Sequence, residues 1–366
     1  MTPETNTTER QLIKQFLDAL RDLPDVHAEL DQSESVGFAH GRSHDAQIDV
    51  RLANKSFVLA IEAKKTVYPR DARQVLWQFR EDSHNRSKEI GDDDVFSILV
   101  AESISPGAKE KLRDERVGYF DSGGSLYLPM PGALFYIDKP PPKILEKSMR
   151  SLFSGRRAQV LETLLLHHQT WFGGKDLAEQ ALVSPATVSE VLTELERFDW
   201  VKSRGQGPSK ERFLSEPAAL LDAWVKQIPS IRPPALRRYF IPSVRVDTLL
   251  EHIGQVFDKN EVTYAISHEA AAQRLSPFLS NISQVRCRVL MGSSADLVIN
   301  ELGARAVNDG ANLAIIEVQS PGELLFRELV GGIWFSNTIQ IYFDLLRGEG
   351  RATEMAEHIR KELIGF

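Results

Sequence analysis

The sequence predicts a multidomain α/β protein, and three observations lead to this prediction. The chain has 366 residues, of which 42% are hydrophobic and 26% charged, so it is long enough for more than one packed core. Segments with an apolar period of two alternate with segments of helical period. Proline-rich stretches at residues 139–142 and 228–242 interrupt this alternation. We therefore expect three domains, over residues 1–142, 143–227 and 243–366.

Composition and charge restrict the classes of function. The formal net charge of -7 argues against a surface coated with cations, so any nucleic-acid-binding face must be local. The only cysteine is Cys287, which excludes an intramolecular disulfide and a zinc site built from clustered thiols. No run of about 18 apolar residues is present, and the first residues do not resemble a secretory leader. We expect a cytoplasmic protein without a membrane partner.

The first domain is expected to contain a mixed sheet with helices on both faces. Leu12, Phe16 and Leu20 recur at helical spacing, and later apolar residues alternate or cluster as in strands. Helices are predicted over residues 8–23 and 71–82, and strands over residues 26–30, 46–52, 57–64 and 96–101. A further helix and closing strands are expected up to about residue 137.

Two of these predicted strands carry a pattern suited to metal-dependent phosphodiester cleavage. Asp49 lies in the second strand, and Glu62 and Lys64 end the third. The period of two places Glu62 and Lys64 on one face of their strand. Two carboxylates can hold Mg²⁺, and a lysine beside the ion can orient or deprotonate the attacking water. The alternative is a solvated Glu–Lys pair on an exposed strand.

The arrangement resembles the PD-(D/E)xK restriction-endonuclease-like superfamily. This resemblance implies catalytic roles for Asp49, Glu62, Lys64 and Gln74, and a magnesium ion held by Asp49, Glu62 and Glu9. Gln74 matches a position at which some members carry a glutamine facing the site. Glu29 competes with Glu9 as the additional metal ligand. The chain departs from the pattern before Asp49, where Ile48 replaces the proline.

The central domain is predicted to be a helix-turn-helix followed by a β-hairpin. An amphipathic helix over residues 156–167 precedes a glycine pair, a short helix over residues 175–181 and a turn at residues 182–184. Ser184 is a favourable N-cap and Pro185 suits the first helical position, so a longer helix is expected to run to residue 198. Residues 200–204 and 211–214 are predicted strands around a glycine-rich turn.

Residues 152–215 thereby resemble the winged-helix regulators of bacteria, which implies double-stranded DNA as a partner. In such proteins the second helix enters the major groove by its N-terminal end. The residues expected there are Ser184, Thr187, Ser189 and Glu190. The expected cations of the wing, which would contact phosphates, are Lys202, Arg204, Lys210 and Arg212. The alternative is a protein–protein docking module.

The last domain is expected to be α/β and without catalytic activity. Helices are predicted over residues 246–257, 268–279 and 352–363, and strands over residues 285–291, 312–318 and 339–345. Residues 264–279 and 341–360 look like the AbiEi family of type IV toxin–antitoxin antitoxins and regulators. That family lacks a nuclease-like N-terminal domain, so residues 1–138 are a departure. The glycine–serine turn at residues 292–294 is similar to that of nucleotidyltransferases, but Glu317 is the only carboxylate of its strand.

Two functions follow as expectations. The first is a DNA-binding transcriptional regulator of the AbiEi antitoxin type with an appended nuclease-like domain, which would bind a cognate toxin or a second copy of itself. The alternative is a Mg²⁺-dependent DNA endonuclease that its winged helix directs to the target.

Overall fold

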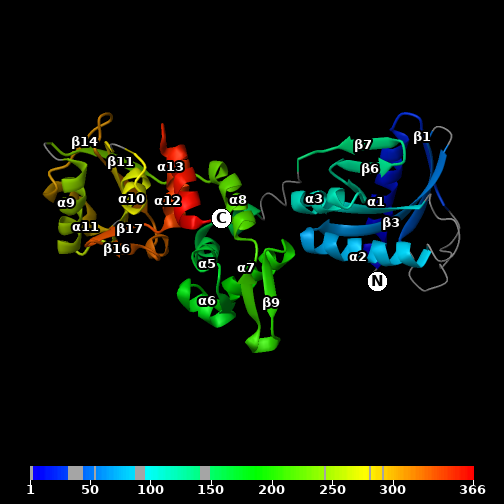
Figure 1. Ribbon diagram of the computed structural model, residues 1–366, viewed down its shortest axis with the longest axis horizontal. Coiled ribbons are helices and arrows are strands. Elements are labelled where there is room, and N and C mark those ends of the chain that lie inside the picture. Colours follow the sequence, from blue (N-terminus) through cyan, green and yellow to red (C-terminus); the bar gives the residue numbers. More distant parts are fainter. Residues whose placement is uncertain are drawn as a thin grey trace. The chain divides into compact units, whose positions relative to one another are not determined.

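The computed structural model describes residues 3–31, 44–52, 55–86, 95–140, 149–242, 245–279, 282–290 and 292–366. The protein is mixed α/β, as the sequence predicts (Figure 1). The chain divides into two compact units, Met1–Met149 with Thr193–Asp199, and Arg150–Leu192 with Trp200–Phe366. The predicted domain boundaries at residues 142–143 and 243 lie outside the described residues, as does the end of the predicted strand at Met291.

The first unit is built on a sheet of seven strands that follow one another in sequence order. The strands are β1 (Val26–Leu30), β2 (Ala46–Leu52), β3 (Lys55–Val67), β4 (Val95–Ile104), β5 (Gly118–Asp121), β6 (Leu126–Met130) and β7 (Ala133–Ile137). Strands β3, β4 and β5 are parallel, and the other neighbours are antiparallel. The helices are α1 (Pro3–Arg21), α2 (Pro69–Arg86) and α3 (Pro106–Asp114). Helices α2 and α3 make the crossovers that parallel strands require.

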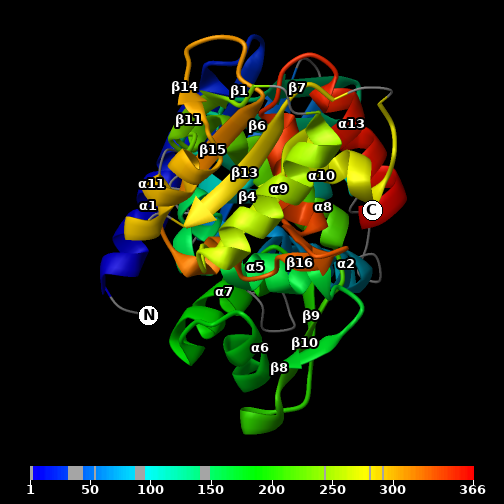
Figure 2. The same ribbon diagram turned by 90° about the vertical axis from the view of Figure 1, so that its left-hand side faces the viewer.

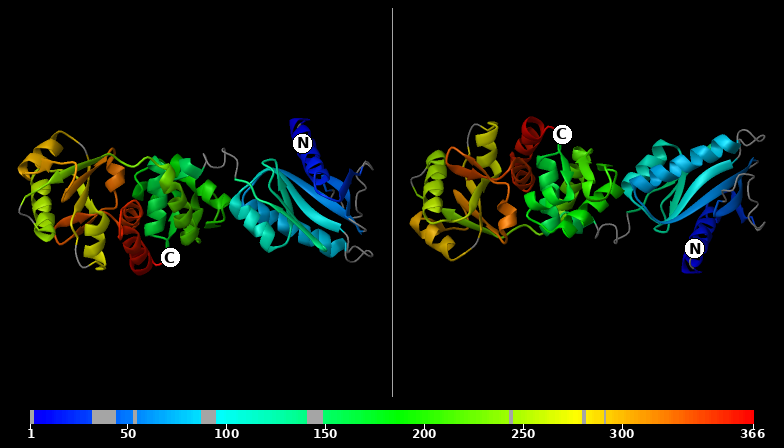
Figure 3. Two further views of the ribbon diagram at one scale, coloured as in Figure 1. Left: turned by 90° about the horizontal axis from the view of Figure 1, so that it is seen from above. Right: turned by 90° about the horizontal axis from the view of Figure 1, so that it is seen from below.

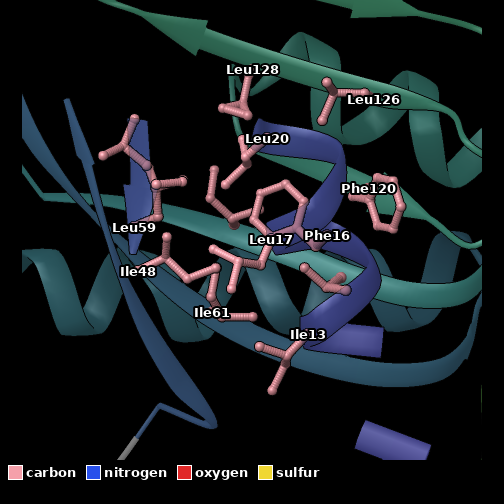
Figure 4. Close-up of a cluster of buried hydrophobic side chains, with 14 of the residues drawn as sticks. Ile13, Phe16, Leu17, Leu20, Ile48, Leu59, Ile61, Phe120, Leu126 and Leu128 are labelled. Carbon is pink, nitrogen blue, oxygen red and sulfur yellow. The ribbon is translucent and has the colours of Figure 1, made fainter. Parts of the chain in front are cut away.

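Alternation along the strands gives this sheet two apolar faces, each covered by helices (Figure 3). On one face, Phe16 and Leu20 of α1 pack with Ile48, Leu59 and Ile61 (Figure 4). The opposite face carries a second cluster, to which α2 and α3 contribute Ala72, Val75, Leu76, Phe79, Ala108 and Leu112. Because neighbouring residues of a strand point to opposite faces, Glu62 lies on the α2 side, between Ile61 and Ala63 on the α1 side.

A buried lysine connects α3 to the end of the sheet. Lys109 Nζ lies 2.8 Å from Asp121 Oδ2 and donates to Ser125 Oγ at 2.6 Å. All three side chains are buried. Such a pair is stable only while both partners are present, because either charge alone would be desolvated without compensation.

The second unit begins with a small module of three helices and three strands. Its helices are α5 (Gly155–Leu166), α6 (Gly174–Gln180) and α7 (Pro185–Arg197), of which the part from Thr193 groups with the first unit. Its strands are β8 (Trp171–Gly173), β9 (Val201–Arg204) and β10 (Glu211–Leu214), in the order β8-β10-β9 with a 3-10 turn at η1 (Gly207–Ser209) (Figure 2). The predicted helices and the two hairpin strands are confirmed. Strand β8 was not predicted from the sequence.

The rest of the second unit is a larger sheet in the order β14-β11-β15-β13-β12-β17-β16. Its strands are β11 (Leu236–Phe240), β12 (Tyr264–Ser267), β13 (Val285–Leu290), β14 (Arg305–Ala306), β15 (Leu313–Val318), β16 (Glu328–Val330) and β17 (Ile333–Phe335). Its helices are α8 (Pro217–Gln227), α9 (Val246–Lys259), α10 (His268–Leu275), α11 (Ser293–Glu301), α12 (Thr338–Leu346) and α13 (Ala352–Ile359). Short helical turns are η2 (Ile228–Ser230), η3 (Pro321–Leu324) and η4 (Arg360–Ile364).

The strand predicted over residues 339–345 is wrong, because this segment is the helix α12. Ile339, Ile341, Tyr342 and Leu345 are all buried, so the helix has little polar face to mark its period. The side chain of Asn337 accepts a hydrogen bond from the backbone N–H of Gln340 and caps the helix. The predicted helix from residue 268 is also shorter than expected and ends at Leu275.

Candidate nucleic-acid interface

The first turn of α7 presents polar side chains next to a hydrogen-bonded cap. Ser184 Oγ accepts from the backbone N–H of Thr187 at 3.2 Å and lies 3.0 Å from Thr187 Oγ1. Ser184 and Ser189 are exposed, whereas Val188 is buried. This spacing leaves the apolar side of the helix in the core and the hydroxyl side facing solvent. The positive end of a helix at this position suits phosphate or base contacts.

The acidic residue in the second turn of α7 is neutralised locally. Glu190 Oε2 lies 2.7 Å from Arg157 Nη2, which belongs to α5. Both side chains are exposed, so the pair contributes little to stability. Its consequence is electrostatic, because the arginine offsets a carboxylate that would otherwise repel an approaching phosphate.

The β9–β10 hairpin separates the four predicted wing cations onto two faces. Lys202 pairs with Phe213 and Arg204 with Glu211, and these residues share one face of the sheet. Arg212 lies on the other face with the buried Phe172. Lys210 comes just before β10 and is partly buried. Lys202 and Arg204 are exposed and are the cations best placed to meet a ligand.

An aromatic residue that the sequence analysis did not select completes this outer face. The Arg204 guanidinium stacks over the Trp171 ring at 4.3 Å from its centroid, and Trp171 packs on Phe213 at 5.3 Å. Arg204 Nε also donates to Glu211 Oε2 at 2.6 Å. Stacking holds the guanidinium flat on the ring. The signal for Trp171 depends on the short strand β8, which has too few residues to show a period.

The turn of the hairpin requires glycine at one position. Gly205 has a φ of 74°, and a Cβ at this residue would lie 2.6 Å from the carbonyl oxygen of Ser209. An L-residue would therefore be strained by its backbone and would clash with the opposite side of the turn. Gly205 fixes the path of the chain between Lys202 and Lys210.

In the first unit, the proposed nuclease residues share a face but not a position along the sheet. Asp49 is exposed on β2 and pairs with Val58 of β3, both on the α2 side. Glu62 follows Val58 by four residues, which is roughly 13 Å along a strand. The residue that lies next to Glu62 across the strands is Asp45, whose N–H donates to Ile61 O and whose Oδ2 accepts from Ala63 N.

Of the remaining residues of the predicted site, Lys64 and Glu29 each lie beside one of these carboxylates, whereas Gln74 and Glu9 do not. Lys64 Nζ pairs with Glu62 Oε1 at 2.6 Å. Gln74 is exposed on the side of α2 away from its buried residues. Glu9 belongs to α1, which packs against the opposite face of the sheet. Glu29, the competing acid, is the direct cross-strand neighbour of Asp49.

The predicted magnesium ligands are not placed to share one ion. Within the described ranges, no group of three or more His, Cys, Asp or Glu side chains is placed to hold a metal ion. Mg²⁺ needs oxygen ligands about 2.1 Å from the ion, so carboxylates separated by four strand positions cannot share it. Asp49 and Glu62 therefore have no common ion in this geometry.

The second unit contains a buried ion pair that no sequence motif indicated. Arg288 of β13 donates to Asp344 of α12 from Nε at 2.8 Å and from Nη2 at 2.6 Å. Ser267 Oγ and Gln340 Nε2 donate to the same carboxylate. Burial alone would raise the pKa of Asp344, but Arg288, His268 and Ser267 outweigh it and lower the pKa to about 2. The pair fastens α12 to the sheet.

No family model, curated protein or solved structure matches this chain. No helix in the described part of the chain is both long and apolar enough to cross a membrane.

Proposed function

We propose that the module from α5 to β10 is a winged helix-turn-helix that binds double-stranded DNA, with α7 as the recognition helix. The observation that carries this proposal is the outer face of the hairpin, where exposed Lys202 and Arg204 lie beside Trp171. A cationic and aromatic face next to a polar helix start is suited to phosphates and sugars. A docking module for proteins needs no such combination.

We further propose that the chain is a transcriptional regulator of the AbiEi antitoxin type with an appended restriction-endonuclease-like domain. The resemblance of residues 264–279 and 341–360 supports the family, and the buried Arg288–Asp344 pair is consistent with a structural domain in that region. The first unit is proposed to serve in DNA contact or protein association, since Asp49 and Glu62 are not placed to share an ion. A cognate toxin or a second copy of the chain is the expected protein partner.

The experiment measures DNA affinity and its dependence on salt. The full chain is titrated against a short labelled duplex of mixed sequence by fluorescence anisotropy, between about 50 and 200 mM salt. Each phosphate contact contributes roughly 0.9 to the slope of log K against log salt concentration. Lys202→Ala and Arg204→Ala should therefore each lower the slope by about 0.9.

The matched control is Lys226→Ala, which removes an exposed lysine from α8, outside the proposed face. This variant should keep the slope of the wild type. An unchanged slope in both wing variants would place the interface elsewhere, and no binding at low salt would favour the docking module.

A further inference from the structure

A large cavity lies inside the second unit, between the three-helix module and the larger sheet. Its volume is about 810 Å³, which falls in the range of small-molecule sites. Helix α5, the turn before α7, helix α8 and helix α12 all contribute to its wall. The cavity therefore touches both the proposed DNA-binding module and the domain that carries the buried ion pair.

Arginine and glutamate side chains both line the cavity. The arginines are Arg288 and Arg347, together with Arg232 and Arg156 nearer the solvent, and the glutamates are Glu162, Glu317 and Glu323. The charge of Arg288 is matched by Asp344, which already holds its Nε and Nη2, and its Nη1 lies 4.0 Å from Glu323 Oε2. Arg347 is partly buried, and burial and the neighbouring Arg288 both lower its pKa against the opposing effect of Asp344. An anionic group of a ligand beside Arg347, in addition to Asp344, would offset the repulsion between Arg347 and Arg288.

A carboxyl group faces the same space. Glu162 of α5 lines the cavity, and its Oε1 accepts from Asn337 Nδ2 at 2.7 Å. Burial raises the pKa of Glu162 to about 7, although Asn337 and Arg288 oppose the shift. In its protonated form Glu162 is neutral and donates a hydrogen bond, so an anionic oxygen of a ligand can lie beside it.

Aromatic side chains also line the cavity. Trp224 packs on Phe153 with ring centroids 5.6 Å apart and on Phe343 with centroids 4.8 Å apart. All three rings line the cavity. These rings offer apolar area to the part of a ligand that carries no charge.

We propose that the cavity binds a small organic acid, with its carboxylate at Arg347 and its apolar part on Trp224 and Phe343. An arginine fork matches a carboxylate geometrically, and the aromatic side chains give the acid an apolar anchor. A neutral molecule of the same shape lacks the charge-assisted hydrogen bonds, so it binds more weakly.

The site also reaches the turn that starts the recognition helix. Leu182, Val183 and Ser184 line the cavity, and Ser184 is the cap of α7. An organic acid in the cavity therefore contacts the segment that sets the first turn of α7, and its presence changes DNA affinity. This second consequence rests on the proposed function, whereas binding of the acid does not.

The first experiment is calorimetric titration of the full chain with benzoate and 3-phenylpropionate, each compared with its amide. Both acids should bind, and at least one should bind about tenfold more tightly than its amide. Arg347→Gln should weaken binding of that acid about tenfold or more, whereas Arg305→Gln, an exposed arginine on β14, should have no effect. Ala158→Phe, which fills the cavity from α5, should abolish binding.

The proposal is overturned if neither acid binds at millimolar concentration, or if both amides bind as tightly as the acids. It is also overturned if Arg347→Gln binds like the wild type, with thermal unfolding showing that the variants are folded. Anisotropy with the labelled duplex then tests the second consequence separately. Binding of the acid without any DNA binding would refute the proposed function and leave the cavity assignment intact. DNA binding without binding of the acid would refute the cavity assignment and leave the proposed function intact.

Discussion

Replacing Asp344 by asparagine removes the carboxylate that pairs with the buried Arg288 guanidinium while keeping the shape of the side chain. Arg288 and Asp344 are 4% and 2% exposed, so solvent cannot replace the lost charge. Breaking one side of a buried ion pair costs about 3–5 kcal/mol of unfolding free energy. For a domain of 150–250 residues this lowers Tm by roughly 6–20 °C.

The pH dependence of unfolding gives a second value for the free energy that this ion pair contributes to stability. The pKa of Asp344 in the folded protein is about 2, against 3.8 for the unperturbed group. Because the folded-state pKa is the lower one, the stabilisation is present above about pH 4 and is lost as the pH falls towards 2. The difference corresponds to about 2 kcal/mol. Asp344→Asn should remove this acid-dependent part of the stability.

The assay is calorimetric unfolding of the full chain across this pH range. The double variant Arg288→Met with Asp344→Leu is the control, because replacing both partners by apolar residues removes the unpaired charge and should restore most of the lost stability. A loss of less than about 1 kcal/mol in Asp344→Asn would refute the reasoning, as would a double variant no more stable than the single one.

Three other changes have definite expected outcomes. Glu162→Gln should stabilise the protein by up to about 3 kcal/mol above pH 7. The pKa of Glu162 is about 7 in the folded protein against 4.5 for the unperturbed group, so the wild type loses stability as the pH rises between these values. Urea unfolding of both proteins at pH 4.5 and 8 measures the difference. Gly205→Ala should strain the hairpin by about 1–2 kcal/mol and weaken duplex binding, with Gly174→Ala as the control. Lys109→Met should destabilise the first unit by about 3–5 kcal/mol, because it leaves the buried carboxylate of Asp121 unpaired. Lys65→Met, which changes an exposed lysine, is the control, and a similar Tm for the two variants would contradict the expectation.

Local chemistry made the small helical module predictable from sequence. Ser184 and Pro185 mark the start of α7, and the glycine of the hairpin turn marks the junction of β9 and β10. These signals depend on neighbours within a few residues. The division of the wing cations between two faces depends instead on the pairing of Arg212 with Phe172, which belongs to a strand 40 residues earlier.

The buried ion pair was not predictable for a related reason. Arg288 and Asp344 are 56 residues apart and lie in a strand and a helix, so only the tertiary fold brings them together. The segment around Asp344 is apolar enough to suggest a strand, and a single aspartate in it gives no sign of a partner. The cavity beside this pair follows from the same packing of α5 and α12 and has no signature in the sequence.

The nuclease-like motif shows which part of a site its spacing determines. Strand β2 ends at Leu52 and β3 begins at Lys55, and these two residues are paired. Counting along the antiparallel ladder from this pair places Asp49 opposite Val58. Bringing Asp49 opposite Glu62 would shift the register by four residues. That shift is even, so it keeps every side chain on its present face and the apolar pattern does not oppose it. The register between β2 and β3, which the motif does not determine, therefore decides whether two carboxylates can share an ion.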